Sequence, residues 1–269
     1  MNNAQRRIFI LSLIFLVTGY NGIVSAGENA GGSNQIADDG SIITSTVWYV
    51  SGADTVSAYL AVPKGEGKFP ALIVIHEWWG LTPWMKSNAD SFAKKGYAAL
   101  AIDLYRGKST SDPKEAMDLV KNFSKERAII DLKAAFNYLT GLPNVNSQKI
   151  GSIGWCFGGG YSFQSALNIP QLTLCIVNYG TLSSDESLIK NIHCPMLCIF
   201  GDEDKAILPD SVKAFDKAAK DIGLNADVRF FPGVGHAFMN PGNKNGYKKE
   251  IADLAWENIF SFLDKNLKN

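Results

Sequence analysis

The chain has few cysteines, few histidines and no excess charge of either sign. Its 269 residues include four Cys and three His, and 26 basic side chains balance 26 acidic ones. A neutral chain without basic clusters does not suit nucleic-acid binding, and no acidic tail is present. No group of His, Cys and Asp has metal-ligand spacing, so the sequence predicts neither a metal nor an organic cofactor.

A long apolar run is also missing after the first 26 residues. Arg6 and Arg7 precede the apolar run 8–17, and the small-residue site Val24-Ser25-Ala26 follows. This order is typical of a secretory signal peptide over residues 1–26, cleaved after Ala26. An uncleaved anchor is the alternative, but the run is shorter than the roughly 20 residues that span a bilayer. We expect an exported protein, periplasmic or secreted, whose mature form is not membrane-embedded.

Low-complexity segments, internal repeats and interior linkers are absent from the rest of the sequence. Residues 27–40 are rich in Gly, Asn, Ser and Asp, which predicts a flexible lead-in. The chain is 46% hydrophobic and 19% charged, an ordinary globular composition with enough length for a large core. We expect residues 41–269 to form a single domain.

Apolar strands alternate with helices through this domain. Residues 42–50 and 56–62 predict two antiparallel strands around a turn. Further strands are expected at 70–76, 98–104, 149–154, 172–179, 195–200 and 227–231, with helices around 131–139, 158–168, 209–222 and 251–263. This order predicts an α/β fold, a mostly parallel sheet with helices on both faces. Chemistry in such sheets gathers at the carboxyl ends of the strands.

One glycine-rich stretch, GWCFGGG at 154–160, follows a predicted strand and precedes a predicted helix. This context is typical of a nucleophile elbow, with Cys156 at the turn and at a helix N-terminus that favours a thiolate. A small buried cysteine and a plain turn are the alternatives. A dinucleotide-binding loop does not fit, because the glycine spacing differs and the next strand ends in Asn178-Tyr179 without an acidic residue.

Acid and base candidates follow two later strands. Asp204 comes after the strand at 195–200, and His236 comes after the strand at 227–231. The chain order of Cys156, Asp204 and His236 is the order expected in an α/β-hydrolase. Such a base activates the thiol, and the carboxylate orients the base. Asp202 is a rival for the acid.

Five short motifs together resemble the dienelactone hydrolase family, a group of α/β-hydrolases with a cysteine nucleophile. They are His-Glu-x-x-Gly at 76–80, Asp-Leu-Tyr at 103–105, Gly-x-Cys-x-Gly-Gly at 154–159, Gly-x-x-Asp at 201–204 and Gly-His-x-Phe at 235–238, within about residues 45–265. The resemblance implies the α/β-hydrolase fold, with Cys156 as nucleophile and His236 as base. It also favours Asp204 as the acid, because the family places that residue three positions after the glycine.

The resemblance also assigns roles around the nucleophile. Glu77 matches a glutamate that interacts with the resting thiol and moves when substrate binds, while the neighbouring His76 has a structural role. The backbone N–H groups of Phe157 and Trp78 are expected to form the oxyanion hole.

Substrate recognition is where the sequence departs from the family. Dienelactone-cleaving members hold a substrate carboxylate with two arginines. Arg106, just after Tyr105, lies close to the first position, but Asn240 occupies the second and offers no charge. We expect these residues and aromatic side chains to contact the substrate in a larger pocket, the aromatic ones being Trp78, Trp79, Trp84 and Phe238. Ordinary packing of the aromatic residues is the alternative.

The sequence thus predicts an exported hydrolase of small esters or lactones with a Cys-His-Asp triad. A non-catalytic binding protein and a redox-sensing thiol protein are the alternatives. Cys175, Cys194 and Cys198 are expected to be buried free thiols, with one disulfide among the three as the alternative.

Overall fold

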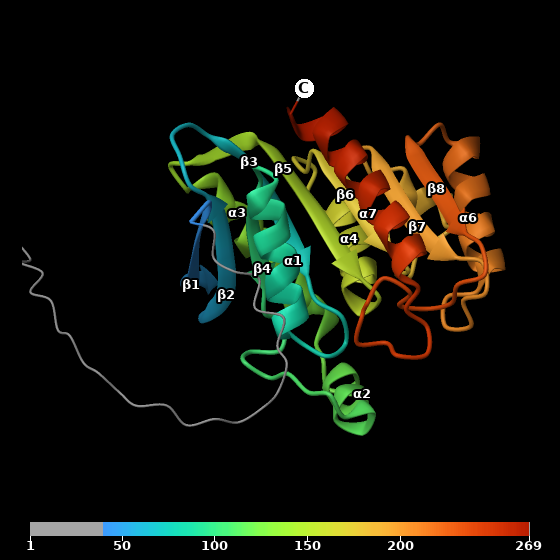
Figure 1. The fold of residues 1–269 in the computed structure, drawn as a ribbon. Coiled ribbons are helices and arrows are strands. Elements are labelled where there is room, and N and C mark those ends of the chain that lie inside the picture. The colour runs from blue at the N-terminus through green and yellow to red at the C-terminus, as the bar shows by residue number, and fades with distance from the viewer. Residues whose placement is uncertain (1–39, 269) are drawn as a thin grey trace, which may run out of the picture. The chain divides into compact units, whose positions relative to one another are not determined.

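The computed structural model describes residues 40–268, so the predicted signal peptide and all but the last residue of the lead-in lie outside the described residues. Eight strands form one sheet in the order β1-β2-β4-β3-β5-β6-β7-β8 (Figure 1). β1 (Ile42–Ser51) pairs with β2 (Asp54–Pro63) in the predicted antiparallel hairpin. β2 pairs antiparallel with β4, and all pairs from β4 to β8 along the sheet are parallel.

The parallel strands form the buried centre of the molecule. They are β3 (Phe69–Ile75), β4 (Ala98–Ile102), β5 (Val145–Trp155), β6 (Leu174–Asn178), β7 (Met196–Gly201) and β8 (Ala226–Phe231). Every residue of β4, β6 and β7 is buried, which explains why these strands are apolar without alternation. The prediction of a mostly parallel α/β sheet is confirmed.

Helices cover both faces of the sheet. Figure 1 shows α1 (Pro83–Lys94) and α7 (Lys249–Leu263) in front of it, with α3 (Lys125–Thr140) and α4 (Phe157–Asn168) behind. α6 (Pro209–Asp221) packs beside α4 through Phe163 and Phe215, so these two helices share one face. The short α5 (Glu186–Ile189) and a terminal π-helical turn, Asp264–Lys268, complete the order. No helix among residues 40–268 is long and apolar enough to cross a membrane.

Three helices, α1, α2 (Pro113–Lys121) and the short α5, were not predicted from the sequence. α1 has the polar residue Asn88 on its buried face, which interrupts the apolar pattern. α2 has one buried residue, Ala116, because it stands away from the sheet, at the bottom of Figure 1. Hydrophobic periodicity reports burial, so a helix with little burial gives a weak signal.

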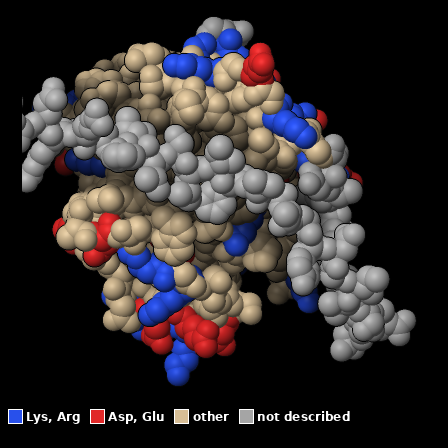
Figure 2. All heavy atoms as spheres, turned by 90° about the vertical axis from the view of Figure 1, so that its left-hand side faces the viewer, with Lys and Arg blue, Asp and Glu red and all other residues tan. Residues whose placement is uncertain are grey.

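β1 lies at one edge of the sheet, on the side of the molecule that faces the viewer in Figure 2. The strand contains no charged residue, and Trp48 is 64% exposed on it. Acidic and basic side chains gather together at the lower end of this view. The candidate catalytic residues lie elsewhere, because they follow the carboxyl ends of the parallel strands.

Candidate active site

A sharp turn between β5 and α4 presents Cys156. Its backbone has φ +53° and ψ −116°, a left-handed conformation that is rare for a residue with a side chain. The Cys156 amide donates a 2.9 Å hydrogen bond to the Asn178 carbonyl, which holds the strained turn against β6. A Cβ on Gly154 would collide with the Gly158 carbonyl, and one on Gly158 with the Ile75 carbonyl. The glycines therefore permit the close contacts of a nucleophile elbow.

A continuous chain of polar contacts connects three residues from separate strand ends. His236 Nε2 lies 3.0 Å from Cys156 Sγ, and His236 Nδ1 lies 2.8 Å from Asp204 Oδ2. The buried Asp204 also accepts hydrogen bonds from the amides of Ala206 and Ile207. Asp202 is exposed, and its carboxylate accepts from the amide of Gly233 instead. The fold thus brings Asp204, and not Asp202, to the histidine.

Electrostatics within this array stabilise a charged imidazole ring. Burial opposes that charge, but hydrogen bonds to Asp204 and Cys156 outweigh it and raise the pKa of His236 to about 10. Burial likewise opposes ionisation of Asp204, yet the hydrogen bond from His236 and those from two backbone amides keep its pKa below the usual value. The 3.0 Å contact between His236 Nε2 and Cys156 Sγ places a base within reach of the thiol proton, as activation of a thiol nucleophile requires.

Glu77 is a buried carboxyl group at the end of β3, on the same cavity as Cys156. Its side chain is 2% exposed; Oε2 accepts a 2.5 Å hydrogen bond from Asn240 Nδ2, while Oε1 has no partner. Burial, only partly offset by Asn240 and by the charge of His236, raises the pKa of Glu77 to about 7. In this structure the thiol contacts His236, and Glu77 contacts Asn240.

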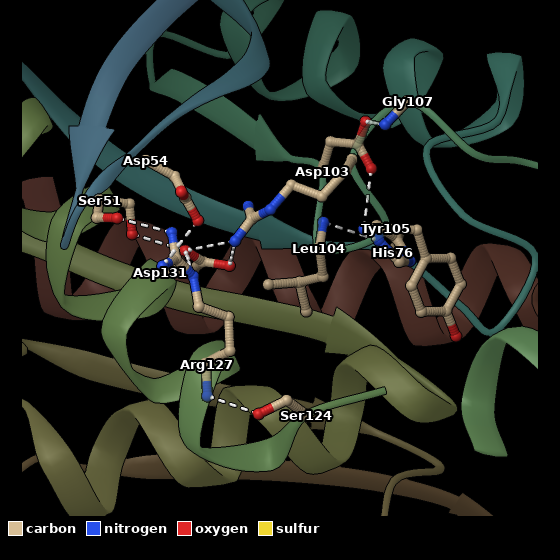
Figure 3. Close-up of polar contacts among 11 residues, drawn as sticks. Ser51, Asp54, His76, Asp103, Leu104, Tyr105, Gly107, Ser124, Arg127 and Asp131 are labelled. Carbon is tan, nitrogen blue, oxygen red and sulfur yellow. Dashed lines mark hydrogen bonds and ion pairs between the residues drawn. The ribbon is translucent and has the colours of Figure 1, made fainter. Parts of the chain in front are cut away.

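His76 connects the ends of β3 and β4 below the site. Its Nδ1–H donates to the Glu77 carbonyl at 2.6 Å. Figure 3 shows the second contact, in which Nε2 accepts from the Leu104 amide at 3.2 Å. These roles fix one neutral tautomer, and complete burial lowers the pKa of His76. Because both ring nitrogens have backbone partners, His76 fixes the position of the loop that carries Glu77 and Trp78.

The two oxyanion-hole candidates follow the ends of β5 and β3. Phe157 is the first residue of α4, and the first amides of a helix have no acceptor within the helix. Trp78 follows Glu77 and lines the same cavity as Cys156. The ring of Phe157 stacks on His76 with centroids 6.0 Å apart, so it packs below the elbow.

The cavity above Cys156 has a volume of about 920 Å³. One part of its wall consists of Trp78, Trp79 and Trp84. Another part is formed by the segment after His236, with side chains of Asn240, Asn243, Lys244 and Asn245. Asn243, Lys244 and Asn245 were not predicted as site residues, because a polar loop gives no local indication of where it folds.

Three of the expected substrate contacts do not line this cavity. Phe238 is completely buried against Tyr179 and Phe231, because the chain reverses at Ala237, whose φ is +56°. This corrects the expectation that Phe238 contacts substrate.

Arg106 and Tyr105 also lie apart from the cavity. Both line a separate hollow beside α2, where the Arg106 guanidinium pairs with Asp131 at 2.8 Å. Asp131 is also bound by Ser51 and Arg127, as Figure 3 shows, so this carboxylate anchors the arginine away from Cys156. The ring of Tyr105 packs between His76 and Phe157, with centroids 4.8 and 5.4 Å away.

Tyr179 is a site residue that sequence reasoning missed. Its ring contacts His236 edge-on with centroids 5.3 Å apart, and its buried hydroxyl has no hydrogen-bond partner. Burial and the nearby Glu77 raise the pKa of Tyr179 far above its usual value, so the hydroxyl stays neutral. Its place directly after β6 was the available signal, since Glu77, Cys156, Asp204 and His236 also follow strand ends.

The remaining cysteines are free thiols within the described part of the chain. Cys175, Cys194 and Cys198 are buried and form no disulfide. Burial raises the pKa of Cys175 to about 11, so this thiol is protonated and unreactive at neutral pH. Residues 40–268 contain no group of three His, Cys, Asp or Glu side chains placed to hold a metal ion.

Comparisons with known proteins identify the family. The model of the dienelactone hydrolase family matches residues 56–267. The chain is 30% identical over 220 residues to a protein of Aquifex aeolicus named "Putative carboxymethylenebutenolidase", covering 79% of this chain and 94% of that protein. It is 32% identical over 219 residues to the protein "usf" of Aquifex pyrophilus, with the same two coverages.

Solved structures share the fold. A dienelactone hydrolase structure from Klebsiella pneumoniae, described as putative, superposes with a TM-score of 0.76 at 23% identity, covering 82% of this chain and 98% of that one. A dienelactone hydrolase-like promiscuous phosphotriesterase from metagenomic libraries gives 0.77 at 22% identity, covering 84% and 99%. The family match spans the whole sheet beyond β1 together with the elbow and both partner loops. The chain belongs to the dienelactone hydrolase family and is a hydrolase of that type.

Proposed function

We propose that the protein is an exported hydrolase of small esters or lactones that uses Cys156, His236 and Asp204 as its catalytic triad. One observation carries this proposal: the sulfur, imidazole and carboxylate form an unbroken chain of contacts of 3.0 and 2.8 Å beside a cavity. The three residues have the relative roles of nucleophile, base and orienting acid. The substrate is a small molecule with a carbonyl carbon that the sulfur can approach.

In the first half-reaction, the Cys156 thiolate attacks the carbonyl carbon and forms a C–S bond. The amides of Phe157 and Trp78 donate hydrogen bonds to the oxygen as it becomes negative. The C–O bond to the leaving group then breaks, and His236 Nε2–H gives its proton to the departing oxygen. An alcohol is released, or in a lactone the hydroxyl end of the opened ring, and a thioester remains on Cys156.

In the second half-reaction, neutral His236 takes a proton from water, which attacks the thioester carbonyl. The C–S bond breaks, the thiolate is restored, and the product leaves as a carboxylic acid. Asp204 holds Nδ1–H throughout, which keeps Nε2 directed at the sulfur. Glu77 lies at the same site with a pKa of about 7, so its protonated fraction at neutral pH limits repulsion with the thiolate.

Hydrolysis of p-nitrophenyl acetate by the mature protein and by Cys156→Ala tests the nucleophile. We expect turnover to be lost in Cys156→Ala and retained in Cys194→Ala, which removes a buried thiol elsewhere. Iodoacetamide should modify Cys156 and abolish turnover in parallel. Equal rates in the wild type and Cys156→Ala would exclude the proposed nucleophile.

Export is supported by the sequence order of residues 1–26, with two arginines, an apolar run and a small-residue site. We expect the protein purified from the cell envelope or medium of an expressing bacterium to begin at Gly27, as measured by intact mass and N-terminal sequencing. A chain recovered from the cytosol with Met1 still present would contradict export.

A further inference from the structure

The sheet order separates the two sides of the nucleophile. β5 carries Cys156 at its end, with β3 and β4 on one side and β6, β7 and β8 on the other. His236 follows β8 and protonates the departing oxygen, so the leaving group lies on the β6–β8 side. The acyl group therefore extends toward the β3–β4 side.

Indole rings form the cavity wall on that acyl side. Trp78 and Trp79 follow β3 directly, with ring centroids 4.6 Å apart and planes at 56°. Trp84, near the start of α1, packs edge-on against the buried Trp155 with centroids 5.8 Å apart. All three line the cavity, and aromatic walls of this kind bind flat apolar groups.

Backbone contacts hold this wall in place. The Thr110 amide donates a 3.0 Å hydrogen bond to the Trp79 carbonyl, and Gly80 and Ser109 form an antiparallel bridge. Gly80 has φ +86°, and a Cβ there would meet the Lys108 carbonyl, so the two strand-end loops touch closely. The wall is preformed by the loops after β3 and β4, which favours binding of a rigid group.

Positive charge is nearly absent from the lining of this cavity. Its ionisable residues are Glu77, Cys156, His236 and Lys244. The first three belong to the reacting centre, so they do not serve to bind an anionic substituent of the substrate. Lys244 is exposed, on the segment after His236. Asn240 occupies the position beside Glu77 and contributes an uncharged amide. Among the described lining residues outside the reacting centre, the exposed Lys244 is the one cation that could balance a carboxylate on the acyl group beside Glu77.

The volume agrees with a bulky acyl group. About 920 Å³ is near the upper end of the roughly 300–1,000 Å³ typical of ligand pockets. We propose that the preferred substrates are esters or lactones whose acyl group is uncharged and carries an aromatic ring, packed against Trp79 and Trp84. This inference rests on the proposed function and adds the class of substrate to it.

Four p-nitrophenyl esters, which share one leaving group, test the inference. We expect kcat/KM for the 3-phenylpropanoate to exceed that for the acetate by about 10-fold or more, because burying an aromatic ring stabilises binding. The glutarate monoester, with its free carboxylate, should react at least about 10-fold more slowly than the neutral pentanoate, which serves as its matched chain. Trp79→Ala should lower the phenylpropanoate-to-acetate ratio about 10-fold, and Trp79→Phe should preserve most of it.

Using a ratio separates selectivity from folding, since loss of folded enzyme lowers both rates equally. Similar kcat/KM for the acetate and the phenylpropanoate, or an unchanged ratio in Trp79→Ala, would overturn the inference and leave the proposed function intact. If the wild type hydrolyses neither ester, the proposed function fails. Binding of 4-phenyl-2-butanone and of 2-butanone to Cys156→Ala then tests the preference for an aromatic group without any turnover. Equal affinity for the two ketones would overturn the inference.

Discussion

The buried carboxyl group of Glu77 allows a quantitative prediction for Glu77→Gln. A pKa raised from the ordinary 4.5 to about 7 means that the folded state binds more protons than the unfolded chain between these values. The free energy of unfolding therefore falls as the pH rises through this window. Glutamine cannot ionise, so the free energy of unfolding of Glu77→Gln does not fall for this reason. The variant should gain stability relative to the wild type as the pH rises.

The magnitude follows from the size of the pKa change. Each pKa unit corresponds to about 1.4 kcal/mol, so ionising Glu77 in its folded site costs about 3 kcal/mol. Solvent does not screen this cost appreciably, because the Glu77 residue is only 2% exposed. Glu77→Gln should match the wild type near pH 4.5 and be more stable by about 3 kcal/mol at pH 8.

Urea unfolding at pH 4.5, 6, 7 and 8, followed by tryptophan fluorescence, measures this difference. Subtracting the wild-type curve cancels every other titrating group that the substitution leaves unchanged. Glu203→Gln, at an exposed position, is the control and should show no pH-dependent difference. A constant offset between Glu77→Gln and the wild type, or an offset that shrinks with rising pH, would refute the reasoning.

Two further predictions concern buried aspartates. Asp204→Asn should lower kcat/KM by about 10³-fold, because the amide no longer favours the imidazolium or the correct tautomer of His236. NMR titration of this variant should place the pKa of His236 below about 10. An unchanged pKa would contradict the assignment of Asp204 as the partner of His236. Asp131→Ala should destabilise the fold by about 3–5 kcal/mol, because it leaves Arg106 without its carboxylate in a part-buried cluster. Urea unfolding measures this loss of stability. Asp210→Ala is the control, because the side chain of Asp210 is 93% exposed, and it should change stability by less than about 0.5 kcal/mol. Similar losses in both variants would contradict the role of the Asp131 cluster.

Sequence patterns were sufficient to predict the architecture and the chain order of the three candidate catalytic residues. Unbroken apolar runs such as 195–200 are typical of strands in a sheet covered on both faces, and the glycines at 154 and 158 permit a sharp turn. A nucleophile, an acid and a base placed directly after such strands must meet at one edge, because parallel strands share that edge. Local pattern and chain order were sufficient for these conclusions.

Which side chains face the cavity became clear only from the three-dimensional fold. Arg106 follows the end of β4 as expected, yet Asp131, 25 residues further along, binds it in another hollow. Phe238 follows His236 closely, but the left-handed turn at Ala237 directs it into the core.

The contact between Asn240 and Glu77 could not be predicted either, because the two residues are far apart in the sequence. Their hydrogen bond joins residues separated by 163 positions, and no pattern within either segment indicates it. Strand and helix patterns report which face of an element is buried, whereas a contact between two loops depends on how both loops fold onto the completed sheet. The three candidate catalytic residues could therefore be selected from the sequence, whereas the lining of the cavity around them required the fold.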